Sequence, residues 1–279
     1  MSLIKFSNFH FRYKGNDEYA LKNINLAINS NRFILLAGET GSGKTTLIRC
    51  LNGLIPQFYA GYYKGFVEIS GKNTTKTSIS ELSNDVGIVF QNPENQLIAM
   101  NVEHEIAFGL ENLGIPKEEI KEKIKEAVEI TEIESILDKA PFEISGGEQQ
   151  RVAIASILVL EPNVIVLDEP TANLDPLFAR KIINLLKKIQ VEKKITIIIS
   201  EHRMDLILPI VDEIILMKEG EILTHGTKNK VINTNIFEKL HINKPKIYSI
   251  FNELKNRNQF QHDIPASIQD AVSLLKTIL

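Results

Sequence analysis

The chain has 279 residues but a single cysteine and a net charge of only −3, with 32 basic against 35 acidic residues. One cysteine excludes a disulfide within the chain, and the lack of a Cys/His cluster argues against a zinc site. The near balance of charge gives no electrostatic reason to expect nucleic acid as a partner. Cys50 stands in a helical pattern, so we expect a small buried residue rather than a reactive thiol.

Long uncharged apolar runs are also missing. No stretch approaches the roughly 18 residues needed to span a bilayer, and residues 1–5 lack the basic-then-apolar layout of a secretory signal. If the protein works at a membrane, we therefore expect another subunit to span it. Hydrophobic residues still make up 43% of the chain and charged residues 24%. This balance favours a packed soluble core, in one large domain with or without appendages.

The most informative stretch is a glycine-rich loop between a buried-strand pattern at residues 33–37 and a helical pattern at residues 46–54. It contains G-x-x-x-x-G-K-T in the context that a phosphate-binding P-loop requires. Glycines let successive backbone N–H groups surround a polyphosphate, and the helix N-terminus adds its positive dipole end. Lys44 is expected at the β- and γ-phosphates, and the Thr45 hydroxyl at Mg²⁺. The residues predicted to bind the nucleotide here are Gly38, Glu39, Thr40, Gly41, Ser42, Gly43, Lys44, Thr45 and Thr46.

Polar residues follow three further strand patterns, at residues 85–90, 163–167 and 195–199. Open α/β sheets place ligand-contacting groups at the C-terminal ends of their strands. Gln91 follows the first pattern, and the carboxylates of Asp168 and Glu169 follow the second, where they are costly unless paired, hydrated or liganded. Asp168 matches the Walker-B acid that supports Mg²⁺, and Glu169 can accept a proton from an attacking water. A lone histidine is usually incidental, but His202 follows the third strand at the same edge, which favours contact with phosphate.

A second helix start combines two features. Ser145 and Glu148 fit a capping box, which is a purely structural reading. A capping box does not need the paired glycines Gly146 and Gly147, which weaken a helix and permit close approach from outside. An anion at this helix N-terminus is the natural candidate. Farther on, Asp175 precedes a proline and is expected to cap another helix.

The N-terminal segments at residues 3–11, 21–28 and 66–69 alternate apolar and polar residues, which predicts an antiparallel layer against the P-loop core. Tyr13 offers a face on which adenine can stack, although a tyrosine near a turn more often serves packing. Residues 97–140 are predicted to be helical, because Val102, Ile106 and Leu110 recur at four-residue spacing. The charge-rich part of that region is expected to be a solvated helix face.

Together these segments resemble the nucleotide-binding subunit of ATP-binding cassette (ABC) transporters over nearly the whole chain. The motifs occur in the family's order: the P-loop, the glutamine loop at Gln91, the signature from Ile144 to Gln149, the Walker-B run ending in Asp168 and Glu169, the loop at residues 172–175, and His202. Ile144 stands where the family usually has leucine. A P-loop alone is shared by many NTPases, but this combination is highly specific.

The resemblance implies two subunits head to tail with two ATP molecules between them. Each ATP would meet the P-loop of one subunit and the signature helix of the other, through Ser145, Gly146, Gly147 and Glu148. The implied metal ligands, direct or through water, are Thr45, Gln91 and Asp168. The implied catalytic set is Glu169, which polarises the water, with His202, Gln91 and Lys44. Asp175 would link the two sites, and Tyr13 matches the family's adenine-stacking position. Intact Glu169 and His202 argue for hydrolysis rather than a silent ATP-binding site.

A finer resemblance is to the ATPases of energy-coupling factor importers, which take up vitamins or transition-metal ions. It rests on residues 90–97, 102–114 and 201–205, and on a helical tail at residues 240–279 that contributes to pairing. This resemblance implies a second ATPase subunit, a transmembrane coupling subunit and a substrate-binding membrane subunit, at the cytoplasmic face of the membrane. The groove by the glutamine loop, at Leu97, Ile98, Met100 and Val102, would receive the coupling helices, unless these side chains are internal core.

We therefore expect an α/β fold of the P-loop NTPase, ABC type, with an antiparallel layer, an inserted helical subdomain near residues 92–160 and a C-terminal extension at residues 236–279 after an ATPase domain at 1–235. There are four alternatives. A soluble ABC machine on ribosomes or DNA, or the ATPase of another importer class, fits the nucleotide motifs. A small-molecule kinase has no use for the signature helix, and a non-hydrolysing binder requires damage to Glu169 or His202. The transported substrate and the choice between homodimer and heterodimer are open.

Overall fold

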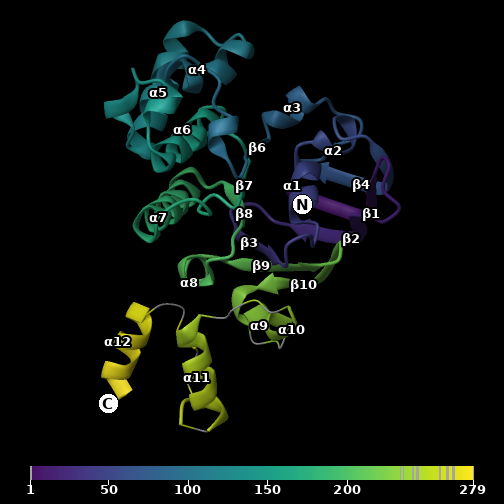
Figure 1. The fold of residues 1–279 in the computed structure, drawn as a ribbon, viewed down its shortest axis with the longest axis vertical. Coiled ribbons are helices and arrows are strands. Elements are labelled where there is room, and N and C mark those ends of the chain that lie inside the picture. The colour runs from purple at the N-terminus through teal and green to yellow at the C-terminus, as the bar shows by residue number, and fades with distance from the viewer. Residues whose placement is uncertain are drawn as a thin grey trace.

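The computed structural model describes residues 2–232, 234, 236–240, 242, 245–257, 259–261, 264–265 and 268–278. It shows an α/β fold with two sheets, a helical lobe beyond one edge of the larger sheet and two C-terminal helices at the opposite end (Figure 1). The strands are β1 (Ile4–Tyr13), β2 (Leu21–Ile28), β3 (Phe33–Gly38), β4 (Gly61–Ile69), β5 (Lys72–Asn73), β6 (Val86–Val89), β7 (Val164–Asp168), β8 (Thr196–Ser200), β9 (Glu213–Lys218) and β10 (Glu221–Thr227). The helices are α1 (Lys44–Leu51), α2 (Leu54–Gln57), α3 (Ile79–Ser83), α4 (Val102–Asn112), α5 (Lys117–Thr131), α6 (Gly146–Leu158), α7 (Pro176–Lys193), α8 (Met204–Ile207), α9 (Lys228–Ile232), α10 (Ile236–Lys239), α11 (Lys246–Asn256) and α12 (Ile268–Ile278), with short 3-10 turns η1 (Pro93–Asn95), η2 (Glu134–Ile136) and η3 (Pro141–Glu143).

The larger sheet carries the P-loop strand in its interior. Its order is β10-β9-β3-β8-β7-β6, with β9, β3, β8, β7 and β6 parallel and β10 antiparallel at the edge. Every residue of β3, β6, β7 and β8 is buried, as expected of parallel strands covered on both faces. Because these strands are parallel, their C-terminal ends meet at one edge. That edge carries the P-loop, Gln91, Asp168 and His202.

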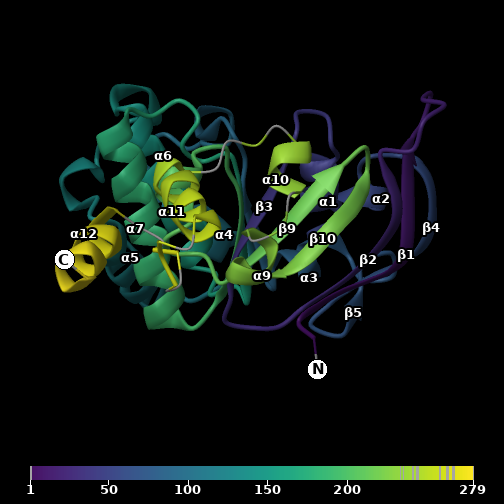
Figure 2. The ribbon, with the colours of Figure 1, turned by 90° about the horizontal axis from the view of Figure 1, so that it is seen from below.

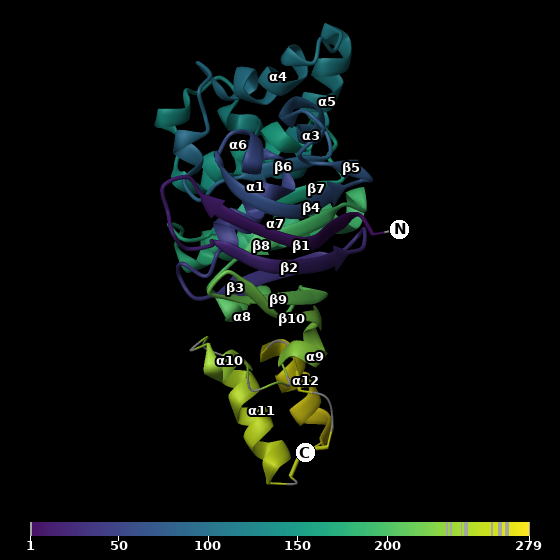
Figure 3. The same cartoon turned by 90° about the vertical axis from the view of Figure 1, so that its right-hand side faces the viewer.

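The antiparallel layer is present as expected, with strand order β2-β1-β4-β5. Figure 3 shows β1, β2 and β4 lying across the front of the larger sheet. Its inward side chains, such as Phe9 and Phe11, pack with α1 and with one face of the larger sheet in a shared core. The third strand is longer than predicted, because β4 begins at Gly61 and its exposed first half pairs with β1 without an apolar pattern.

The helical lobe consists of α4, α5 and α6, and Figure 2 shows it beside α7, across the molecule from β1 and β4. The prediction of a helix from residue 97 was wrong at its start, since α4 begins only at Val102. The side chain of Asn101 caps α4 by accepting from the N–H of His104 at 2.9 Å. The Glu105 carboxylate accepts from the N–H groups of Ile98 and Ala99 at 2.8 and 2.7 Å, which closes the preceding loop.

The C-terminal segment is divided between two cores. Phe237 and Tyr248 pack into the main core beneath the helical side of the larger sheet, whereas Phe251, Phe260 and Ala271 form a small separate cluster. The predicted boundary at residue 235 stays a prediction. Phe237 and Leu240, just beyond it, still contribute to the main core. Among the helices that the structure describes, none has the length and apolar character needed to cross a membrane.

Candidate active site

The P-loop joins β3 to α1 and depends on glycine at particular positions. Gly38 has φ +158, and a Cβ there would lie 2.3 Å from the backbone oxygen of Met217. Gly43 precedes α1 in the left-handed region at φ +100, where a side chain is strained. The loop therefore adopts its curve because these positions carry no side chain.

Lys44, the first residue of α1, is folded back over the loop. Its Nζ donates to the backbone oxygens of Gly38 at 2.9 Å and Glu39 at 3.0 Å. Burial lowers the pKa of Lys44, and the nearby carboxylates of Glu169 and Asp168 oppose that shift. The ammonium group thus lies in the loop, facing two carboxylates, where an incoming phosphate would meet it.

Two observations indicate that the loop suits a polyphosphate. The first turn of any helix leaves backbone N–H groups without intrahelical partners, and here that turn begins at Lys44 directly after the loop. The buried Oγ of Ser42 also has no hydrogen-bond partner within the described part of the chain. Donors gathered at a helix N-terminus form a ready anion site.

The predicted metal residues Thr45 and Asp168 lie in contact. The Thr45 hydroxyl donates to Oδ2 of Asp168 at 2.8 Å, while the Ser200 hydroxyl donates to Oδ1 at 2.6 Å. Asp168 is almost fully buried at 6% exposure, and these two hydroxyls, together with the nearby Lys44 ammonium, stabilise its charge. A hydroxyl beside a buried carboxylate is an oxygen pair that suits Mg²⁺, which takes one or two protein ligands together with phosphate oxygens.

Glu169 adopts a left-handed conformation, with φ +49. Its backbone N–H donates to the Ser200 hydroxyl at 2.8 Å, which fixes the unusual backbone. Its side chain contacts His202 Nε2 at 2.9 Å through Oε1 and the Gln91 amide at 3.0 Å through Oε2. A strained non-glycine residue at the end of a core strand is typical of a functional position. Three residues predicted from separate motifs are therefore brought together.

Sequence reasoning missed the residues that hold this edge in place. The Ser200 hydroxyl donates to the Asp168 carboxylate and accepts from the backbone N–H of Glu169. Glu201 is buried and accepts from the hydroxyl of Thr171 at 2.5 Å. Glu201 also accepts from the N–H of His202 at 2.9 Å. The signal for Ser200 was present, because it is the last residue of β8, at the edge where ligand-contacting groups gather.

The signature helix α6 has the predicted capping box. The Ser145 hydroxyl caps the N–H of Glu148, and the Glu148 carboxylate accepts from the backbone N–H and the hydroxyl of Ser145 at 2.8 and 2.7 Å. The two glycines differ. A Cβ on Gly147 would lie 2.9 Å from the Phe178 ring, whereas one on Gly146 would meet only Leu174 at 3.9 Å. Gly147 thus serves packing against α7, and only Gly146 leaves the helix mouth open as expected.

Two further predicted residues lie at the ends of elements. Asp175 caps α7, accepting from the N–H groups of Leu177 and Phe178 at 2.8 and 3.1 Å. Tyr13 ends β1 beside the P-loop helix, with its hydroxyl 3.1 Å from Oγ1 of Thr46. Tyr13 is half-buried, whereas a side chain that stacks adenine was expected to be exposed, and it packs edge-on against Phe11 with ring centroids 4.8 Å apart.

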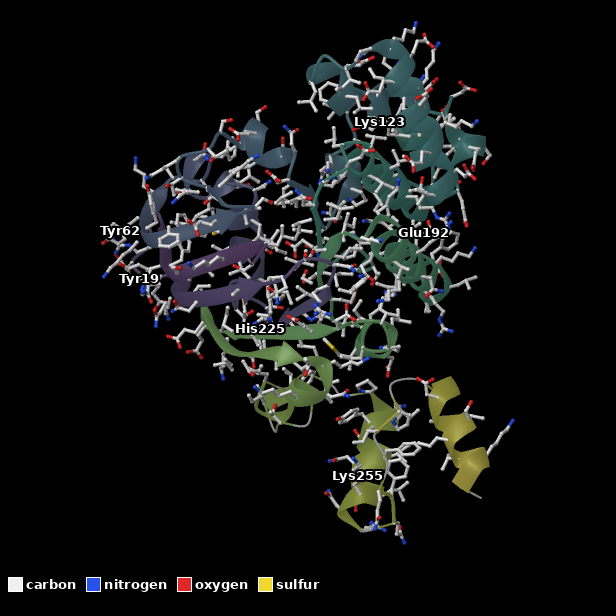
Figure 4. All side chains as sticks on the ribbon, turned by 180° about the vertical axis from the view of Figure 1, so that it is seen from behind. Tyr19, Tyr62, Lys123, Glu192, His225 and Lys255 are labelled. Carbon is white, nitrogen blue, oxygen red and sulfur yellow. The ribbon has the colours of Figure 1, made fainter. Side chains whose placement is uncertain are left out.

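A cavity of about 330 Å³ opens beside Tyr13, between residues 12–16 and residues 60–62. Its outer rim is aromatic and basic. The guanidinium of Arg12 lies 5.7 Å from the Tyr19 ring centroid and 6.0 Å from that of Tyr62. Figure 4 shows Tyr19 and Tyr62 close together at the outer edge of the antiparallel layer.

Of the four residues of the expected docking groove, two are buried and two are exposed. Leu97 and Val102 are core, while Ile98 and Met100 are 70% and 86% exposed. Phe142 is also 86% exposed in the same lobe. The internal-core interpretation therefore holds for two of the four positions, and the other two present apolar side chains at the surface.

Comparison with known proteins shows the family. Residues 21–172 match the family model described as "ABC transporter". Over 99% of its length the chain is 41% identical to the putative ABC transporter ATP-binding protein PH1815 of Pyrococcus horikoshii, and covers 97% of that relative. Fold and site together define a P-loop ATPase. More particularly, the chain belongs to the ABC transporter ATP-binding proteins, and it is an ATP-hydrolysing subunit of a transporter.

The energy-coupling factor group is among its relatives. The chain is 42% identical over 259 residues to the energy-coupling factor transporter ATP-binding protein EcfA2 of Caldanaerobacter subterraneus, with 91% and 90% of the two chains covered. The structure of CbiO1 from Clostridium perfringens, described as part of the ABC transporter complex CbiONQ, matches with a TM-score of 0.76 at 33% identity. That match covers 90% of this chain and 99% of the other. Other curated relatives are longer, and the chain spans 41% to 47% of their length.

Proposed function

We propose that this chain is the ATPase subunit of an importer of the energy-coupling factor type, in which ATP-driven closure of two ATPase subunits powers uptake of a vitamin or a transition-metal ion. The observation that carries the catalytic part is the contact set of Glu169, which joins the Gln91 amide, the His202 ring and, through Ser200, the carboxylate of Asp168. The likeness to EcfA2 and CbiO1 supports the transport part.

Glu169 acts as the general base for the attacking water. The Glu169 side chain is 24% exposed, so water can reach it, while the left-handed backbone and Ser200 fix its position. His202 lies on one carboxylate oxygen and Gln91 on the other, so both orient the base. With ATP bound, His202 also holds the water and the γ-phosphate in line.

Lys44 and the loop residues 38–46 bind the phosphates. The Lys44 ammonium exchanges the backbone oxygens of Gly38 and Glu39 for β- and γ-phosphate oxygens, a stronger charge-assisted contact. Thr45 and Asp168 would hold Mg²⁺, with Gln91 contributing directly or through water. When bound, Mg²⁺ supplies positive charge that stabilises the transferring phosphoryl group.

The signature helix serves the ATP of a second subunit. Ser145 and Gly146 are exposed at the mouth of α6, and the Cβ position of Gly146 has open space on its outer side. The mouth therefore combines a helix N-terminus with room for a phosphate from outside the chain. Asp175, exposed at the adjacent start of α7, would link the two sites.

Ile98 and Met100 form the proposed contact with a transmembrane coupling subunit at the cytoplasmic face of the membrane. Exposed apolar side chains that gather beside a functional loop mark a docking surface. The complex would also contain a substrate-binding membrane subunit, and the partner ATPase is either a second copy or a related chain.

The importer proposal is tested by purifying the tagged protein from native membranes in mild detergent, alongside an Ile98→Glu/Met100→Glu variant. A matched control is Val191→Glu, which alters a side chain of 59% exposure on α7. We expect wild type and the control to retain helical membrane proteins, and the double variant to lose them while keeping ATP binding. Recovery of ribosomal or DNA-bound partners instead would contradict the proposal.

A further inference from the structure

Arg49 contacts two tyrosines beside the nucleotide loop, one through its hydroxyl and one through its ring, although no sequence motif singles Arg49 out. It lies on α1 between the P-loop and Cys50. Its Nη1 donates to the Tyr13 hydroxyl at 3.3 Å, and its guanidinium carbon lies 4.4 Å from the ring centroid of Tyr59. Within the described part of the chain no carboxylate pairs with Arg49, and its buried Nε has no hydrogen-bond partner. Its charge is therefore directed at aromatic groups rather than at an acid.

Tyr13 is held at both ends of its side chain. The hydroxyl lies between Thr46 Oγ1 at 3.1 Å and Arg49 Nη1 at 3.3 Å. The ring is clamped edge-on by Phe11 and Tyr59, with centroids 4.8 and 6.4 Å away.

Of the two hydroxyl partners, only Arg49 is independent of the phosphates. Thr46 belongs to the loop that binds them under the function proposed above, so its hydroxyl is engaged when nucleotide arrives. Arg49 lies one turn farther along α1 and keeps its contacts to Tyr13 and Tyr59. A cation over an aromatic face adds an attraction that a hydrogen bond alone does not supply.

We propose that Arg49 is a positioning residue for base recognition. It holds the Tyr13 ring in one orientation, backed by Tyr59, so that adenine stacks on a side chain already fixed. Pre-organisation of this kind strengthens binding because less side-chain freedom is lost when the ligand arrives. The inference rests on the proposed role of Tyr13 in stacking adenine.

The alternative is that Arg49 merely ties β1 to α1. The two accounts differ in which part of the nucleotide is affected. Damage to α1 would weaken every ligand of the P-loop, including one without a base. Loss of a Tyr13 clamp would weaken ATP and leave inorganic tripolyphosphate unaffected, because tripolyphosphate has no adenine.

The test compares binding of Mg-ATP and Mg-tripolyphosphate to wild type, Arg49→Gln, Arg49→Lys and the control Arg32→Gln, by titration calorimetry. Arg32 is half exposed and lies at the opposite edge of the sheet. We expect Arg49→Gln to raise the Kd for ATP about fivefold to tenfold, within the range of base–aromatic stacking. The Kd for tripolyphosphate should stay within about twofold, and Arg49→Lys should recover part of the loss through its charge.

Equal weakening of both ligands, or no weakening of ATP, would overturn the inference. If Arg49→Gln does not fold, the same comparison is made on Arg49→Lys, which retains the charge but loses the fork that reaches Tyr13. Tyr13→Ala separates the role of Tyr13 in stacking adenine from the role of Arg49 in positioning Tyr13. Unchanged ATP affinity in Tyr13→Ala refutes the adenine role itself, whereas weaker ATP binding in Tyr13→Ala but not in Arg49→Gln refutes only the role of Arg49. In the double variant the two losses should not add, since both act through one ring.

Discussion

Nε2 of His202 lies 2.9 Å from Oε1 of Glu169, so the two residues that follow strands β8 and β7 meet across the sheet edge. His202→Ala should lower the turnover number about a hundredfold, because it removes a group that fixes the base and holds the γ-phosphate. ATP affinity should change little. Steady-state ATPase rates measure this, with His104→Ala, an exposed residue of α4, as the control. A turnover near wild type in His202→Ala would remove this residue from the mechanism.

Lys44→Ala tests the contact between the Lys44 ammonium and the phosphates of ATP. The ammonium now donates to two loop carbonyls and would exchange them for phosphate oxygens. We expect ATP affinity to fall about tenfold to a hundredfold, the worth of a hydrogen bond to a charged group. Calorimetric titration checks the loss, and Lys64→Ala, on the exposed half of β4, should bind as wild type. Equal affinity for Lys44→Ala would argue against the P-loop role.

The neighbouring glycines of the signature helix should respond differently to alanine. Gly147→Ala forces a methyl group against the Phe178 ring and should lower the free energy of unfolding by about 1–3 kcal/mol. Gly146→Ala meets open space, so its stability should stay within about 1 kcal/mol of wild type. Urea unfolding measures both. Phe178→Leu should rescue Gly147→Ala, and equal losses for the two glycines would contradict the packing account.

Hydrogen bonds from the hydroxyl and then the backbone N–H of Ser145 lower the pKa of Glu148 below its ordinary value of 4.5. A carboxylate with a depressed folded-state pKa stabilises the protein above its unfolded pKa and loses that contribution as the pH falls through the folded value. We therefore expect the stability difference between wild type and Glu148→Gln to be constant near neutral pH and to shrink below pH 4.5. Urea unfolding across that range measures it, and a difference independent of pH would refute the charged cap.

Much of this site could be predicted from the sequence. Buried parallel strands are continuous apolar runs, so their ends, and with them Asp168 and His202, were placed by pattern alone. Thr45 and Asp168 were both predicted at the metal, and they lie together because one comes after β3 and the other ends β7 of the same parallel sheet. The distances and the left-handed backbone of Glu169 could not, since they depend on Ser200 from a strand farther along the chain.

Other features needed the tertiary structure. Leu97, Ile98, Met100 and Val102 are all apolar, so the sequence does not distinguish them. The loop closed by Glu105 turns Leu97 and Val102 inward and leaves Ile98 and Met100 at the surface. The need for glycine at 147 comes from Phe178, more than thirty residues later, which no local pattern reveals. The contacts of Arg49 could not be predicted either, because its partners Tyr13 and Tyr59 belong to other segments of the chain.

The most direct test of the catalytic account is Glu169→Gln, measured by ATP turnover and by the oligomeric state with Mg-ATP. Glutamine preserves the shape and a hydrogen bond to His202 but cannot accept the proton of the attacking water. We predict a loss of turnover of about a hundredfold to ten-thousandfold, unchanged ATP binding and a dimer that persists only with ATP. Glu221→Gln, on an exposed edge of β10, should behave as wild type. Turnover near wild type in Glu169→Gln would contradict the account, whatever the dimer does.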